Sequence, residues 1–172
     1  MSAFKTLDDL GDVTGKVALV RVDFNVPMND GVVTDDTRIR AAAPTILQLA
    51  EKGAKVLLLA HFGRPKGERV PSMSLSMVVG AVEKVLGKEV MFVPEVAGDV
   101  VKQAVGILRA GDIAILENTR FWKGEEKNEA ELAAAIAANG DFYVNDAFSA
   151  AHRAHASTEG LARVLPAYAG RS

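Results

Sequence analysis

The stretch Arg21-Val-Asp-Phe-Asn-Val-Pro27 marks the point where an apolar run turns abruptly polar. The preceding residues 17–20, Val-Ala-Leu-Val, have the continuous apolar character of a strand that is buried on both faces of a parallel sheet. Asp23 and Asn25 then supply a carboxylate and an amide at the carboxyl end of that strand. In open α/β sheets, ligands bind outside this end of the strands. The stretch therefore predicts a parallel sheet and the edge at which a ligand would bind.

Three further apolar runs end in polar loops, and each of these loops supplies an arginine. Residues 56–60 lead into His61-Phe-Gly-Arg64, residues 113–116 lead into Glu117-Asn-Thr-Arg120, and residues 142–144 lead into Asn145-Asp146 and on to Arg153. Arg38 opens the helical pattern that follows the first loop. Arginine stays charged, and its planar fork fits phosphate and carboxylate groups bidentately. We therefore expect at least three of these four arginines to bind one small, highly anionic ligand.

The remaining sequence alternates between strand and helix patterns. Strands are predicted over 16–22, 55–60, 89–93, 112–116 and 141–144. After the first strand, the pattern predicts a short turn over 38–42 with Thr37 as N-cap, and then a helix from Pro44 to Gly53. Three further helices are predicted between the later strands: one capped by Ser74 and stopped by Gly87, one ended by Gly106, and one opened by Asn128 and Glu131. A weak helix over 158–164 follows the last strand. Residues 32–33 are expected to form a small hairpin. Such alternation is typical of βαβ units. We predict an α/β, three-layer, Rossmann-like domain with a mostly parallel sheet of about six strands flanked by helices.

Composition limits the classes of function that are open. The 172 residues are 49% hydrophobic and 24% charged, as in one globular domain. A net charge of −2 gives no general basic field for nucleic acid or an anionic membrane. Cysteine is absent, which excludes disulfides and thiolate chemistry. No apolar signal core or membrane-length run is present. We expect a cytoplasmic protein whose anion site is local.

Several candidate residues also have simpler interpretations. Asp23 and Asn25 could orient a ligand hydroxyl, or they could cap their own loop through local backbone hydrogen bonds. His61 could donate to a phosphate oxygen or stabilise its own loop. His152 and His155 are three residues apart, but no further ligand pattern supports them, so no metal site is expected.

Other features are interpreted as structural or are missing. Trp122 is expected to be a packing residue, and residues 125–127, Glu-Glu-Lys, to be a solvated charge cluster. The sequence contains no G-x-x-x-x-G-K-[ST] loop, no G-x-G-x-x-G after the first strand and no G-x-S-x-G elbow. Nothing in it therefore predicts a cradle for a nucleoside triphosphate.

Five blocks of sequence carry a resemblance to a known family. They are RVDFNVP (21–27), DDTRIRAAAPTI (35–46), AHFGRPKG (60–67), LENTRFWKGEEKN (116–128) and NDAFSAAHRAHAST (145–158). With these blocks, which span most of the chain in the family's order, the sequence resembles phosphoglycerate kinases, specifically their N-terminal domain. Phe62 departs from the leucine that many members have there, and little effect is expected.

The resemblance implies a reaction. Members of the family transfer a phosphoryl group reversibly between ATP and the carboxylate of 3-phosphoglycerate, giving 1,3-bisphosphoglycerate and ADP, in glycolysis. It implies that residues 1–172 form a single substrate-binding domain and that the Mg-ATP or Mg-ADP site lies on a C-terminal domain that this chain lacks. We therefore expect a monomer that binds 3-phosphoglycerate but no cofactor, nucleic acid or membrane. Alone, it is expected to be inactive.

Position by position, the resemblance also implies a set of substrate-binding residues. They are Asp23, Phe24, Asn25, Arg38, His61, Phe62, Gly63, Arg64, Arg120 and Arg153. Asp23 and Asn25 would contact the hydroxyl and carboxyl end of the glycerate. His61, Arg64, Arg120 and Arg153 would hold the phosphate that is not transferred. Arg38 would be the catalytic residue, because it would stabilise the phosphoryl group in flight.

Two other functions stay open at this point. A stand-alone binding module for a small phosphorylated metabolite would use the same arginines. A nucleotide-binding Rossmann domain is disfavoured by the missing glycine-rich loop. Activity restored by a separate nucleotide domain would favour the kinase, whereas specific ATP binding would favour the nucleotide-binding domain.

Overall fold

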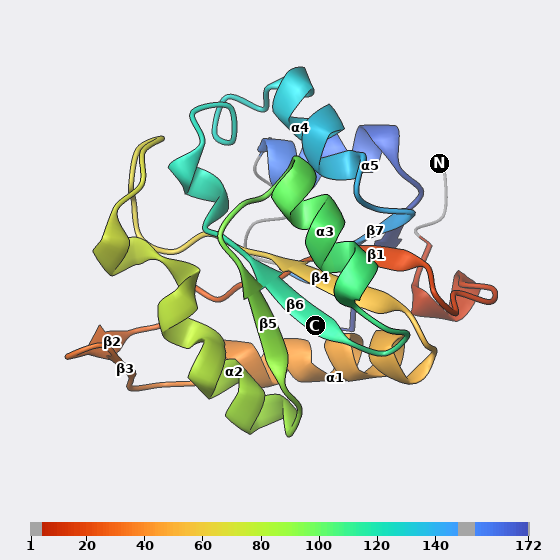
Figure 1. Ribbon diagram of the computed structural model, residues 1–172, viewed down its shortest axis with the longest axis horizontal. Coiled ribbons are helices and arrows are strands. Elements are labelled where there is room, and N and C mark those ends of the chain that lie inside the picture. The colour runs from red at the N-terminus through yellow and green to blue at the C-terminus, as the bar shows by residue number, and fades with distance from the viewer. Residues whose placement is uncertain (1–4, 148–153, 172) are drawn as a thin grey trace.

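The computed structural model describes residues 5–147 and 154–171 (Figure 1). Its centre is a six-stranded sheet made of β1 (Val17–Arg21), β4 (Lys55–Leu59), β5 (Val90–Val93), β6 (Ile113–Leu116), β7 (Phe142–Asn145) and β8 (Ala167–Ala169). The strand order is β5-β6-β4-β1-β7-β8, and every neighbouring pair is parallel. The predicted mostly parallel sheet of about six strands is confirmed.

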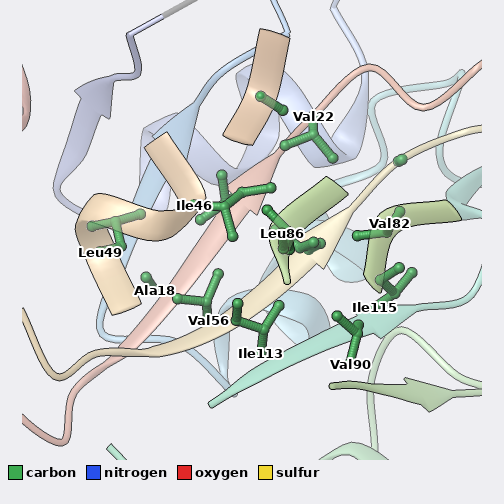
Figure 2. Close-up of a cluster of buried hydrophobic side chains, with 14 of the residues drawn as sticks. Ala18, Val22, Ile46, Leu49, Val56, Val82, Leu86, Val90, Ile113 and Ile115 are labelled. Carbon is green, nitrogen blue, oxygen red and sulfur yellow. The ribbon is translucent and has the colours of Figure 1, made fainter. Parts of the chain in front are cut away.

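Helices cover both faces of the sheet (Figure 1). They are α1 (Thr37–Glu51), α2 (Val79–Leu86), α3 (Asp99–Ile107), α4 (Ala130–Ala137) and α5 (Leu161–Val164). One hydrophobic core contains Ala18 and Val20 of β1 together with side chains of α1 and α2, and Figure 2 shows part of it. The other core contains Val17 and Leu19 together with side chains of α3, α4 and α5. Successive side chains of a strand point to opposite faces, so the two cores make the three predicted layers.

Short elements connect these layers. They are the 3₁₀ helices Leu7–Asp9, Pro71–Met73, Leu75–Val78 and Thr119–Phe121, the π-helix Ala156–Gly160, and the hairpin of β2 (Met28–Asn29) and β3 (Val32–Val33). The hairpin turns at Asp30 and Gly31, both of which have positive φ, as a type I′ turn requires. The predicted hairpin at 32–33 is therefore confirmed.

The predicted break before Pro44 is wrong. Helix α1 continues through Pro44 from Thr37 to Glu51. An internal proline costs about 3 kcal/mol, but the apolar side chains of Ile39, Ile46 and Leu49 are fully buried along this helix. Burying three such side chains contributes more than the proline costs, at about 1.5–3 kcal/mol each. Thr37, the predicted N-cap, is instead the first residue of the helix. Its backbone N–H and its hydroxyl both donate to the Asp35 carboxylate.

Other helix boundaries also differ from the prediction. Asn128 has φ +51° and precedes α4, which begins at Ala130, so it forms no capping box. Ser74 does cap a helix, but the first turn is 3₁₀ and α2 begins at Val79. Helix α3 runs one residue past Gly106. The weak helix predicted over 158–164 corresponds to the end of the π-helix and to α5, but its π-helical first part was not expected. Strand β8, with three residues, has no clear periodic pattern and was not predicted.

Candidate functional site

Asp23 and Asn25 follow β1 directly, and both contact other parts of the predicted site. The Arg38 guanidinium lies 3.3 Å from the Asp23 carboxylate and donates to the Asn25 carbonyl at 2.8 Å. The Asn25 side-chain oxygen accepts from the backbone N–H of Gly63 at 3.0 Å. The loop after β1 is therefore joined both to the first turn of α1 and to the loop after β4.

The loop after β4 is held by a buried amide. The Asn118 side-chain nitrogen donates to the Phe62 carbonyl at 2.6 Å and to the Met73 carbonyl at 2.9 Å. Gly63 has φ +66°, and a Cβ at this position would lie 3.1 Å from the Met73 sulfur. Glycine therefore suits both the backbone conformation and the close approach.

The loop after β6 brings Arg120 to the same place. Its side chain is almost fully buried, its guanidinium lies 3.4 Å from the Gly63 carbonyl, and its Nε lies 3.5 Å from the Glu126 carboxylate. The backbone N–H of Arg120 donates to the Asn118 side chain at 3.0 Å. The loops that follow β1, β4 and β6 thus form one connected edge, because these strands are neighbours in the sheet.

A basic cavity adjoins this edge. Its volume is about 390 Å³, and it is lined by Lys66, Gly67, Lys123, Glu126 and Lys127. Glu126 links it to Arg120. Three of its lining residues are lysines against one glutamate, and an excess of positive charge raises the local concentration of anions.

A buried polar network lies behind the edge, and sequence reasoning missed it. Arg21 is fully buried at the end of β1 and lies 2.7 Å from the Nδ1 atom of His61. It also donates to the Ser157 hydroxyl, which donates in turn to Glu125. The expectation of a solvated cluster at residues 125–127 is wrong for Glu125, which is fully buried, and holds for Glu126 and Lys127, which are exposed.

One signal in the sequence could have found this network. Arg21 is a lone charge next to an apolar run, at the last position of a strand that is buried over all five residues. A buried charge has to be paired or hydrogen-bonded. The same environment alters nearby groups: burial raises the pKa of the Tyr143 phenol, whose hydroxyl donates to the Ser157 carbonyl at 2.9 Å. Burial also lowers the pKa of the His155 imidazole.

The predicted site residues fall into four groups. Asp23, Asn25, Arg38, His61, Phe62, Gly63 and Arg120 are brought together through the contacts above. Arg64 is in the same loop as His61 and is exposed. Phe24 has a fully buried side chain in the core, so only its backbone could reach a ligand. Arg153 lies outside the described residues, as does His152, at which no metal site was expected.

Two absences hold within the described part of the chain. Residues 5–147 and 154–171 contain no group of three or more His, Asp or Glu side chains that could hold a metal ion. No helix in these ranges is long and apolar enough to cross a bilayer.

Comparison with known proteins identifies the family of the chain. The family model described as "Phosphoglycerate kinase" matches residues 7–172. The chain belongs to the phosphoglycerate kinase family. The curated phosphoglycerate kinase of Sphingopyxis alaskensis is 67% identical over 172 residues, and that of Rhizorhabdus wittichii is 68% identical over 170. These matches cover 100% and 99% of this chain but 43% of each relative.

Solved phosphoglycerate kinase structures share the fold. The enzyme from Pyrococcus horikoshii superposes with a TM-score of 0.86 at 34% identity, covering 96% of this chain and 42% of that protein. The enzyme from Coxiella burnetii superposes with a TM-score of 0.85 at 37% identity, covering 97% of this chain and 41% of that protein. The chain thus spans less than half the length of the phosphoglycerate kinases it matches.

Proposed function

We propose that residues 1–172 form the domain of a phosphoglycerate kinase that binds 3-phosphoglycerate. The whole enzyme transfers a phosphoryl group reversibly between ATP and the carboxylate of this substrate. The observation that carries the proposal is the connected edge formed by the loops after β1, β4 and β6. Family membership supplies the reaction, and the edge supplies the residues that suit its acceptor.

The chemistry of the edge matches the charge of the ligand. 3-Phosphoglycerate carries a phosphate at one end and a carboxylate at the other. Arg120 and Arg64 can bind the phosphate through planar forks, and His61 contributes a ring nitrogen beside them. Asp23 and Asn25, at the end of β1, are placed to accept or donate to the glycerate hydroxyl. Bonds from several loops to one small ligand fix its position, which is what phosphoryl transfer most needs from a protein.

Arg38 has a different role in the proposal. Its side chain is 53% exposed and is held by Asp23 and the Asn25 carbonyl. A guanidinium in this position can follow the phosphoryl group as it moves between donor and acceptor, and it can stabilise the negative charge on the three equatorial oxygens. We therefore assign Arg38 the role of stabilising the transition state of phosphoryl transfer.

The Mg-nucleotide is the second substrate and is assigned to another part of the enzyme. The sequence has no glycine-rich phosphate loop. A sequence without this loop suits a domain that binds the acceptor.

The test is a titration of 3-phosphoglycerate into the 172-residue chain, followed by calorimetry and by Trp122 fluorescence. Saturable binding that weakens with added salt is expected. Arg64→Ala and Arg120→Lys should weaken it at least tenfold, since each loses a bidentate anion contact. Arg109→Ala removes the same charge from an exposed site before β6, at the opposite end of the sheet, and should leave the affinity within about twofold.

Two outcomes would overturn the proposal. One is a folded chain that shows neither binding nor thermal stabilisation, although 3-phosphoglycerate at 100 times its Kd should add about 2.7 kcal/mol. The other is equal weakening by Arg109→Ala and Arg64→Ala. Activity gained by adding the part of a relative that this chain does not cover would separate the kinase domain from a stand-alone binding module.

A further inference from the structure

A row of side-chain hydrogen bonds runs from Glu125 to His61. The Ser157 hydroxyl lies 2.5 Å from the Glu125 carboxylate, and the Arg21 Nε lies 3.0 Å from the same hydroxyl. The other end of the Arg21 guanidinium lies 2.7 Å from His61 Nδ1. Glu125, Ser157 and Arg21 are all fully buried, whereas His61 is half-buried. The row therefore joins the protein interior to a residue of the proposed site.

The direction of each hydrogen bond in this row is fixed. A guanidinium has five N–H donors, no acceptor, and does not lose its proton in proteins. Arg21 must therefore donate both to Ser157 and to His61. An ionised carboxylate can only accept hydrogen bonds, so Ser157, which accepts from Arg21, donates its single hydroxyl proton to Glu125.

This direction determines the state of the His61 ring. Since Nδ1 accepts a hydrogen bond, it carries a lone pair, and the ring proton of the neutral imidazole is on Nε2. Any hydrogen bond made by Nε2 is then one that it donates. The opposite tautomer would place a lone pair on Nε2 and repel an anion near it.

We propose that Arg21 is a positioning residue that fixes His61 in the Nε2–H tautomer, so that the ring offers a donor to the bound anion. Arg21 acts through His61 and does not itself touch the ligand. The identity of the anion rests on the proposed function, but the tautomer does not. Ser157 and Glu125 support Arg21, because Ser157 accepts from its Nε and Glu125 supplies a balancing negative charge in a fully buried region.

Burial makes this arrangement persistent. Arg21 also donates to the Val22 carbonyl, and Ser157 is held further by its own backbone N–H, which donates to Glu125 at 2.8 Å. The guanidinium is thus held by the buried Ser157 hydroxyl and Val22 carbonyl and by the half-buried His61 ring. A side chain held in this way keeps its orientation before any ligand arrives.

The experiment records two-bond ¹H–¹⁵N spectra of the chain labelled at histidine, without ligand and at about pH 8.5, where imidazoles are neutral. The sequence has three histidines, and His61→Gln identifies the signal of His61. The Nε2–H form is expected to exceed the Nδ1–H form at least about tenfold, as a charged hydrogen bond on one nitrogen implies. An Nδ1–H pattern, or comparable amounts of both forms, would overturn the proposal.

Variants connect the tautomer to Arg21. Arg21→Met removes the donor with similar side-chain length, and both tautomers of His61 should then be populated. Arg21→Lys restores a donor and should restore the Nε2–H form. Ser157→Ala leaves the Arg21–His61 contact in place, so the Nε2–H form of His61 should persist in this variant. A folded Arg21→Met chain with an unchanged tautomer ratio would refute the role of Arg21. Should Arg21→Met fail to fold, the spectra of the unmodified chain and of Ser157→Ala still show whether His61 is held in the Nε2–H tautomer.

The same samples separate this inference from the proposed function. A fixed tautomer without 3-phosphoglycerate binding would refute only the proposed ligand. Binding with a mixed tautomer would refute only the role of Arg21. If both hold, Arg21→Met should weaken binding severalfold and Arg21→Lys should recover most of the loss.

Discussion

Glu125 and Ser157 are 32 residues apart in sequence and are joined by two hydrogen bonds to the two oxygens of one buried carboxylate. The bonds measure 2.8 Å from the Ser157 backbone and 2.5 Å from its hydroxyl. Glu125 also accepts at its backbone carbonyl from the N–H of Ala156. This one residue therefore holds the start of the π-helix Ala156–Gly160 against the loop after β6.

Replacing Glu125 should cost much more stability than replacing its neighbour Glu126. Glu125→Ala leaves two buried donors of Ser157 without their acceptor, at about 1–3 kcal/mol each. Glu126→Ala removes a carboxylate whose side chain is 55% exposed and that lies 3.5 Å from Nε of the buried Arg120, and it leaves no donor of Ser157 without an acceptor, so it should cost less than Glu125→Ala. Urea unfolding of both variants measures the difference. Equal losses would show that the buried carboxylate is not the group that holds the π-helix.

Two glycine-to-alanine changes should have opposite signs. In Gly140→Ala the new Cβ would lie 2.5 Å from Leu19 Cγ in the core, and overpacking of this kind costs about 1–3 kcal/mol. In Gly80→Ala the methyl group would meet no atom within 4 Å, on the exposed side of α2. Alanine is favoured over glycine inside a helix by about 0.8–1 kcal/mol. Thermal unfolding should show the first chain less stable and the second more stable than the parent.

Arg38→Ala should separate substrate binding from catalysis. Arg38 is half-exposed and contacts the β1 loop through Asp23 and Asn25, so its loss should change 3-phosphoglycerate affinity less than about threefold. In a full-length relative that carries residues 1–172 of this chain, kcat should fall about 100- to 1,000-fold, as for loss of one charge-stabilising donor. Titration and steady-state kinetics measure the two effects. An unchanged kcat would show that Arg38 does not stabilise the transition state.

Stability should fall as pH is lowered from about 7 towards 5, in part because of His155. Burial lowers the pKa of this imidazole, Arg120 and Arg21 act in the same direction, and Glu125 and Glu126 oppose them. In the unfolded chain a histidine ionises near pH 6.5. Between the folded pKa and this value the unfolded state binds more protons, so the free energy of unfolding decreases as pH falls.

The contribution of His155 can be measured by difference. His155→Gln cannot take up the proton, so its stability should decline less over the same pH range than that of the parent chain. Urea unfolding at pH 7.5, 6.5 and 5.5 compares the two. Parallel declines would show that His155 is not responsible, and that other groups, such as the other two histidines, carry the pH dependence.

Much of the architecture could be predicted because apolar runs and polar ends have a direct physical meaning. A strand covered on both faces must be continuously apolar. Its carboxyl end is where polar residues can face a ligand, so the pattern placed Asp23 and Asn25 at this edge. In the structure they lie against Arg38 and the loop of Gly63, and the Asp23 carboxylate also accepts from the Asn25 backbone N–H, which is the local capping contact that the sequence left open.

The parts that could not be predicted depend on distant contacts. Glu125 looks like any surface glutamate until Ser157 folds over it. Pro44 looks like a helix start because a local rule cannot weigh the apolar side chains that the helix buries. Arg21 looks like the charged end of a strand, and its side-chain partners His61 and Ser157 come 40 and 136 residues later. The local sequence pattern cannot predict these three features, since each depends on contacts with residues that are distant in sequence.

The central place of β1 has a consequence for biosynthesis. β1 is the first strand of the sheet to be made, and β4 is the first of its two neighbours in the sheet to follow it. Its other neighbour is β7, and the contact that joins Val17 to Asp141 at the start of that strand spans 124 residues. Until those residues have been made, the β7 side of β1 is an open, hydrophobic edge, which can pair with another chain. Nascent chains that pause before residue 141 should therefore be the form of this protein that depends most on chaperones.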